Sequence, residues 1–137
     1  MSRKSDFQFT NPALLKISYE INKEFSADEE KQIQIEVKTE TNVGMADSGN
    51  EAFVILRVEI GGREKELPFW IEAEEGASFR WNADILSKSE IDGLLKQNAP
   101  ALLLSYLRST VAMVTAASPL GTYNIPFMNF TYSEDAE

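Results

Sequence analysis

Apolar and polar residues alternate along the first half of the chain, as they do in strands that bury one face. The alternation runs through residues 13–21, 33–40, 52–60 and 65–73, and it predicts four strands. Between the last two segments, the Gly61-Gly62 pair permits the positive backbone angles of a tight hairpin. The pattern therefore predicts a small antiparallel sheet.

The period of the pattern changes from that of a strand to that of a helix after residue 86. Ser87 and Glu90 have the spacing of a capping box, which predicts a short helix. Asn98 and Pro100 then mark a fresh helix start, and the second helix is expected to run to about Ala117.

The predicted long helix is apolar around most of its circumference, so we expect it to be buried on more than one side. In a single-layer domain only one of those sides can face the domain's own sheet, and the rest predicts a homo-oligomer, a dimer or a tetramer. The residues assigned to the oligomer interface are Leu103, Tyr106, Arg108, Val111 and Met113.

Together these elements predict an α+β fold, a four-stranded antiparallel sheet followed by a short helix and one long helix packed on it. We expect a single domain over residues 7–132, with flexible termini at residues 1–6 and 133–137. The acidic run at residues 28–31 is interpreted as a solvated turn between the first two strands.

The composition removes most catalytic and metal-binding chemistry. The 137 residues include neither Cys nor His, which excludes disulfides, thiolate nucleophiles, imidazole catalysis and zinc sites of the Cys/His kind. The sequence contains no nucleophile constellation and no cofactor motif. We therefore expect no enzyme activity, no metal and no cofactor.

Net charge and hydropathy indicate which classes of partner and which cellular location to expect. Lys+Arg 13 against Asp+Glu 22 gives a net charge of -9, which disfavours nucleic acid and anionic lipid as partners. The first residues lack the apolar region of a signal peptide, so a cytoplasmic location is expected. The apolar run at residues 99–120 contains Arg108 as its single charge. An arginine near the middle of a membrane span is costly, so we expect a buried helix and no membrane insertion.

Apolar side chains are left over after the predicted sheet has filled its own core. We expect these to be exposed or to face an oligomer partner: Phe53, Ile55, Trp70, Phe79, Trp81, Leu120, Tyr123, Ile125, Phe127 and Met128. Two interpretations stand at this point. In one, the residues complete cores and a homo-oligomer interface. In the other, they line a client-binding hydrophobic groove, rimmed by carboxylates, that holds extended apolar peptide.

Five segments, taken in order, resemble the SecB protein-export chaperones. They are KISYE at 16–20, VILRV at 54–58, EAEEGASF at 72–79, NAPALLLSYLRSTVAMV at 98–114 and NIPFMNF at 124–130. None of these motifs is catalytic, and the resemblance rests on their order and on the layout of four strands followed by a helix. The resemblance implies a homotetramer built as a dimer of dimers, with long grooves that hold non-native polypeptide.

The resemblance also implies a partner-docking site on an acidic sheet face. In the family this face docks the SecA translocation ATPase, and Glu20, Trp70 and Glu72 lie at similar positions. The chain departs from the family at Lys16, where an acid is expected. It also departs after Phe130, where seven residues stand in place of a further helix and a flexible tail that contacts SecA. Client holding is therefore better supported than delivery to SecA.

The predicted function is that of an ATP-independent holdase chaperone, which binds unfolded or partly folded polypeptides through hydrophobic grooves, with protein export as one setting. Two alternatives remain open. One is a dedicated adaptor on the same fold that serves one partner, such as an antitoxin. The other is a carrier of a small apolar ligand.

Overall fold

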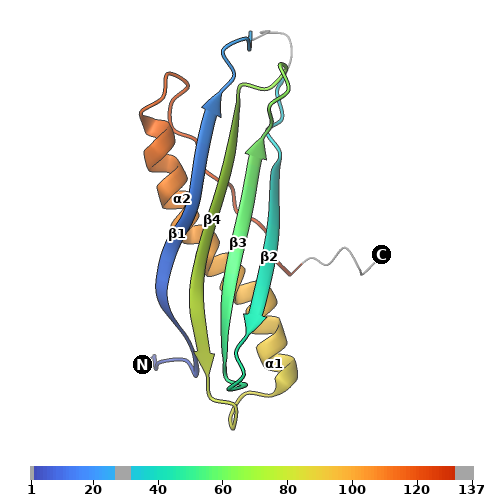
Figure 1. Cartoon of the computed structure of the whole chain (residues 1–137), viewed down its shortest axis with the longest axis vertical. Helices are drawn as coiled ribbons and strands as arrows, with labels where there is room; N and C mark the ends of the chain where they lie inside the picture. The colour runs from blue at the N-terminus through green and yellow to red at the C-terminus, as the bar shows by residue number, and fades with distance from the viewer. Residues whose placement is uncertain (1, 27–31, 132–137) are drawn as a thin grey trace, which may run out of the picture.

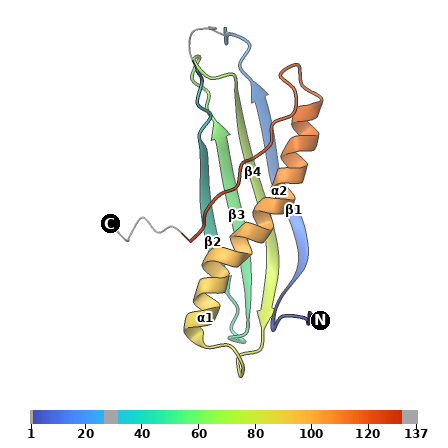
Figure 2. The same cartoon turned by 180° about the vertical axis from the view of Figure 1, so that it is seen from behind.

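The computed structural model describes residues 2–26 and 32–131 as an antiparallel sheet with a long helix on one face (Figure 1, Figure 2). The elements are β1 (Phe7–Ile21), β2 (Val37–Met45), β3 (Glu51–Gly61), β4 (Phe69–Trp81), α1 (Lys88–Gly93), the π-helical turn η1 (Leu94–Asn98) and α2 (Ala99–Ala116). The strand order is β1-β4-β3-β2, so β1 and β2 lie at the edges. The predicted α+β fold is confirmed.

The hydrophobic core lies between the sheet and α2. Alternate residues of β3, from Ala52 to Ile60, are at most 1% exposed, because this inner strand has a strand on either side and the helix above it. Leu103, Leu107 and Val111 of α2 reach the same core. Each such aliphatic side chain contributes about 1.5–3 kcal/mol relative to an exposed one. α2 crosses the strands diagonally, from the β2 side toward the β1 side (Figure 2).

The second strand begins later than its alternation predicts. It starts at Val37 instead of residue 33, because Val37 pairs with Ile60 and β3 ends one residue later, at Gly61. The Glu36 carbonyl still accepts from the Gly61 N–H at 2.9 Å, and residues 33–35 have no stretch of β3 left to pair with. The predicted turn at residues 28–31 and the terminus at 133–137 lie outside the described residues, as does residue 132 of the predicted domain.

The fourth strand also differs, because it spans Phe69–Trp81 instead of residues 65–73. Its second half contains charged residues and a glycine, which hide its alternation, but this half pairs with both β1 and β3. Pairing on two sides holds it extended despite its weak local preference. β1 in turn begins at Phe7 instead of residue 13, because it follows β4 as far as Trp81.

The two predicted helices are one continuous helix. The capping box is confirmed, since the Ser87 hydroxyl accepts from the Glu90 N–H and the Glu90 carboxylate accepts from the Ser87 N–H, each at 3.1 Å. The fresh start predicted at Asn98 is wrong, because this residue has helical angles (φ -75°, ψ -41°) and makes no side-chain cap. The ring of Pro100 would crowd the preceding turn of an α-helix, and the wider turn η1 just before it lets the helix continue.

This continuous helix, residues 88–116, is long and apolar enough by composition to cross a membrane. The core helix of a soluble domain has the same composition. Here Leu103, Leu107 and Val111 are fully buried, and the helix packs along the sheet, as predicted.

Candidate functional site

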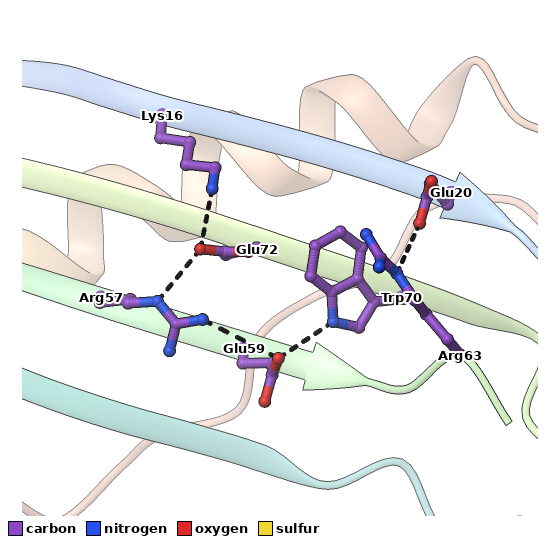
Figure 3. A network of polar contacts seen from close by, with 7 residues as sticks. All are labelled: Lys16, Glu20, Arg57, Glu59, Arg63, Trp70 and Glu72. Carbon is purple, nitrogen blue, oxygen red and sulfur yellow. Dashed lines mark hydrogen bonds and ion pairs between the residues drawn. The ribbon is translucent and has the colours of Figure 1, made fainter.

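The sheet face opposite the helix carries a network of charged side chains around Trp70 (Figure 3). Glu72 of β4 accepts hydrogen bonds from Lys16 Nζ of β1 at 3.0 Å and from Arg57 Nε of β3 at 3.1 Å. Arg57 Nη2 also lies 3.9 Å from Glu59 Oε2. These residues meet because they project from the same face of three neighbouring strands.

The two cations hold Glu72 in its ionised form. The pKa of Glu72 is lowered from its ordinary value, first by the hydrogen bond from Lys16 and then by the one from Arg57. The pKa of Arg57 is raised, chiefly by its hydrogen bond to Glu72. The charge of this carboxylate is thus balanced within the chain, which reduces its attraction for a basic partner.

Trp70 is held at the other end of the network. Its indole Nε1 donates to Glu59 Oε2 at 3.1 Å, and the Arg63 guanidinium carbon lies 4.1 Å from the ring centroid, in cation–π range. Arg63 Nε also donates to Glu20 at 3.0 Å. Glu20, Arg63 and Trp70 line an open hollow of about 320 Å³ beside the β3–β4 hairpin.

The three residues predicted for partner docking, Glu20, Trp70 and Glu72, therefore lie on one face of the sheet, and each is paired within the chain. Their docking role stays a prediction. Sequence reasoning missed Arg63, which connects two of them, although its position directly after the Gly61-Gly62 turn places it at the rim of this face.

The same sheet face also carries an apolar patch beside Gly76. Phe53 is 42% exposed and Leu15 is 49% exposed, and Ile55, which is paired with Gly76, is half-buried. Gly76 of β4 makes room for them, because a Cβ there would lie 2.9 Å from the Phe53 ring and 3.0 Å from the Leu15 side chain. The result is a small exposed apolar patch over the middle of the sheet.

The chain after α2 returns along the helix as an extended segment, residues 122–131, which we call the exit strap (Figure 2). Gly121 makes the turn with a φ of +82°, a backbone angle that glycine adopts without strain. The first attachment is the Thr115 hydroxyl, which accepts from the Tyr123 N–H at 2.8 Å and donates to the Val111 carbonyl at 2.7 Å.

Arg108 makes the second attachment. Its Nε donates to the carbonyl oxygen of Ile125 at 2.8 Å and its Nη2 to that of Pro126 at 3.1 Å. The guanidinium carbon also lies 5.2 Å from the centroid of the Phe127 ring. The lone charge of residues 99–120 therefore binds the strap of its own chain.

The ten apolar residues predicted for client binding differ in how exposed they are. Phe53, Leu120 and Phe127 are exposed, Ile55, Trp70, Tyr123 and Met128 are half-buried, and Phe79, Trp81 and Ile125 are buried. For the last three the expected exposure is wrong. Phe79 and Trp81 lie on the helix side of β4 and stack with Phe7 at 5.4 and 6.1 Å, and Ile125 is the buried residue of the strap.

The five residues predicted for the oligomer interface also differ in how exposed they are. Leu103 and Val111 are 0% exposed in the chain's own core, so their assignment to an interface is wrong, because they face the sheet. Tyr106 is 39% exposed and Met113 is 73% exposed on the outer side of α2. Arg108 lies between the two groups and faces the strap.

Sequence reasoning also missed Glu75, which is 4% exposed on the helix side of the sheet. It pairs in register with Leu14 and Leu56, and burial raises its pKa. The alternation of Ile71, Ala73, Ala77 and Phe79 places Glu75 on the core face, but the predicted end of the strand at residue 73 hid this signal. Among the described residues, no group of three or more acidic side chains could hold a metal ion.

The geometry can be compared with known proteins. No protein-family model and no curated protein matches the sequence. A SecB-like chaperone of Mycobacterium tuberculosis, solved in complex with a peptide from the HigA1 antitoxin, matches with a TM-score of 0.70 at 13% identity, over 90% of this chain and 91% of that chain. A protein of unknown function from Streptococcus agalactiae matches with a TM-score of 0.55 at 13% identity, over 91% of this chain and 100% of that chain. This chain therefore has a SecB-like fold.

Proposed function

We propose that this chain is a polypeptide-binding chaperone, an ATP-independent holdase that works as a homo-oligomer in the cytoplasm and catalyses no reaction. The observation that carries the proposal is the combination of a SecB-like fold with apolar side chains that the chain's own core leaves uncovered. Phe127 is 95% exposed and Met113 is 73% exposed. Aromatic and methionine side chains offer contact area without demanding one sequence, which suits a binder of many clients.

The outer side of α2 supports homo-oligomerisation. Arg108 is the single charge in residues 99–120, and it is turned toward the strap. Tyr106 and Met113 therefore stand on a helix surface that carries no charge. A second copy of the chain would bury this surface, and helix-on-helix packing is the simplest way to do so.

A dedicated chaperone for one client is the second candidate. It is favoured by the Mycobacterium tuberculosis neighbour, which was solved with a peptide from an antitoxin. A carrier of a small apolar ligand has less support, because the hollow beside the β3–β4 hairpin is lined by Glu20, Asn22 and Arg63, side chains that suit polar groups.

Delivery of clients to SecA is not part of this proposal. A basic partner would have to replace Lys16 and Arg57 around Glu72, and Arg63 beside Glu20, before it gained their hydrogen bonds. Exposed acid–base pairs contribute about 0–1 kcal/mol each and weaken with salt. We therefore expect weak binding of SecA to this face.

Light scattering of several unrelated, aggregating clients tests the holdase activity. Wild type is expected to suppress aggregation, and Phe53→Asp and Phe127→Asp are expected to weaken suppression severalfold with unchanged thermal melts. Ile85→Asp is the matched control, because Ile85 is 59% exposed and lies in the turn before α1, which is part of neither the sheet nor the strap. Protection of a single client would favour the dedicated chaperone, and protection of none would refute the holdase.

A further inference from the structure

We propose that the exit strap occupies the site at which an extended client segment binds, so that a client binds by displacing the strap. The inference rests on the proposed function. It names the client-binding site, the strap as the segment that competes for that site, and the chemistry of the client that binds there. The ligand is an extended apolar stretch of unfolded polypeptide that carries an aliphatic anchor.

The strap has the side-chain pattern of a bound extended peptide. Its side chains alternate at first between buried and exposed positions: Tyr123 and Ile125 point inward, and Asn124 and Pro126 point outward. Ile125 is 2% exposed, and the Tyr123 ring meets Phe69 edge-on at 5.4 Å. A bound peptide places alternate side chains in pockets in the same way.

The helix holds the strap by its backbone. Arg108 donates to two successive carbonyl oxygens, and Thr115 accepts from one backbone N–H. Backbone groups are the same in every polypeptide, so these contacts would serve any extended segment that lay there. Thr115 and Arg108 are seven residues apart on one side of α2, and Ala101, seven residues earlier, borders a further hollow of about 330 Å³ beside the end of the strap.

The attachment is also easy to exchange. Within the described part of the chain, residues 122–131 make no backbone–backbone hydrogen bond to any other segment, so no strand ladder has to be broken to release them. Phe127 is 95% exposed and contributes little burial to the closed state. A client that offers one aliphatic anchor, an aromatic side chain two residues before it, two carbonyl groups and one N–H would regain the main contacts that the first half of the strap gives up.

Competition by the strap has a measurable consequence. The strap is tethered and acts at a high effective concentration. If it is closed in about 99% of molecules, the apparent client affinity is lowered about 100-fold. A substitution that weakens only the strap must therefore tighten client binding, whereas a strap with a purely structural role would leave binding unchanged or weaken it.

The experiment uses the full chain and a peptide of its own strap sequence, TYNIPFMNF (residues 122–130), added in trans. Ile125→Ala removes the strap's anchor, and the peptide is expected to bind this variant about tenfold tighter than wild type. Ile91→Ala is the matched control, since Ile91 is also buried, at 6% exposure, but lies in α1. A peptide with aspartate at its isoleucine position is expected not to bind.

Hydrogen exchange of the strap gives a second readout. Saturation of wild type with the peptide is expected to speed exchange of the Tyr123 amide, which is hydrogen-bonded to Thr115 of the helix, and to leave β3 protected. In the Ile125→Ala background without peptide, Arg108→Met is expected to speed exchange of the Tyr123 amide further, because the strap carbonyls lose their donor. If Ile125→Ala fails to fold, Ile125→Val replaces it, with an expected tightening of about threefold.

Equal affinities for Ile125→Ala and Ile91→Ala, or a strap that stays protected at saturation, would overturn the inference. Different outcomes would refute the proposed holdase function. If the strap peptide competes but several carboxymethylated, unfolded proteins bind neither wild type nor Ile125→Ala, the site assignment stands and the holdase does not. If those proteins bind without releasing the strap, the holdase stands and the site assignment does not.

Discussion

At the residue scale, the backbone conformation requires a glycine at position 61 but not at position 93. Gly61 ends β3 with a φ of +72°, and a Cβ there would collide with the carbonyl oxygen of Phe69. Gly93 sits in the continuous helix with a φ of -63°, and nothing lies within 4 Å of where its Cβ would be. The same substitution should therefore act in opposite directions at the two sites.

We expect Gly61→Ala to lower the free energy of unfolding by about 1–3 kcal/mol, because alanine is strained at this positive φ. We expect Gly93→Ala to raise it by about 0.5–1 kcal/mol, because alanine favours the helix and restricts the unfolded chain. Urea unfolding measures both. A Gly61→Ala variant as stable as wild type would contradict the hairpin geometry.

Glu72 and Glu75 lie three residues apart on β4 and so face opposite sides of the sheet. Glu72 is bound by Lys16 and Arg57, and its pKa is lowered. Glu75 is buried among aliphatic residues, and desolvation raises its pKa. The ionised form is thus favoured by folding at one position and penalised at the other.

The two glutamates should give opposite pH profiles. The lowered pKa of Glu72 stabilises the fold above the ordinary value of 4.5, and this contribution is lost as the pH falls through the folded pKa. The ionised Glu75 destabilises the fold progressively as the pH rises from 4.5 through its raised folded pKa. We therefore expect Glu72→Gln to destabilise and Glu75→Gln to stabilise at about pH 7, with both effects shrinking toward about pH 3. Chemical unfolding at a series of pH values tests this, and parallel profiles would contradict it.

At the element scale, the helix has one side-chain cap and one irregular turn. Ser87 and Glu90 close the start of α1 by two reciprocal hydrogen bonds, whereas Asn98 provides no cap and the helix runs on through η1. The start of the whole helix, residues 88–116, therefore depends on Ser87.

Ser87→Ala is expected to lower the free energy of unfolding by about 1 kcal/mol, because the Glu90 N–H loses its acceptor. Ser89→Ala is the matched control: Ser89 is exposed two residues further on, and its substitution should stay within about 0.5 kcal/mol of wild type. Thermal and urea unfolding measure the difference. Equal stabilities of the two variants would show that the cap contributes nothing.

At the scale of the whole molecule, the two sides of the sheet differ in how their charges are arranged. The face around Trp70 is polar and internally paired (Figure 3), while the outer side of α2 carries Tyr106 and Met113 without a charge. Self-association is therefore expected through the helix, and binding of charged partners through the sheet is expected to be weak.

Sedimentation at micromolar concentration tests the assembly. Wild type is expected to be a dimer or a tetramer, and Met113→Asp is expected to dissociate it, because burying an unpaired carboxylate is costly. Phe53→Asp places the same charge on the opposite face and should leave the oligomer intact. A monomeric wild type would remove the basis of the interface.

Features that leave a local pattern could be predicted from the sequence alone. The alternation of β3 and its neighbours reports burial on one face, the Ser87–Glu90 spacing reports a cap, and the uncharged run after residue 98 reports a buried helix. Each depends on residues a few positions apart, so the local sequence by itself indicates the strand, the cap and the helix. The order of these elements also carried the SecB resemblance.

Features that depend on distant partners were decided only by the tertiary structure. Pairing with β1 and β3 extends β4 to Trp81 and so buries Phe79, against its predicted exposure. Arg63 reaches Glu20 across 43 residues of sequence, and Arg108 reaches the strap across 17. Which strands pair, in what register, and which side chain receives a given donor depend on how the whole chain folds back on itself, and periodicity along the sequence does not record those contacts.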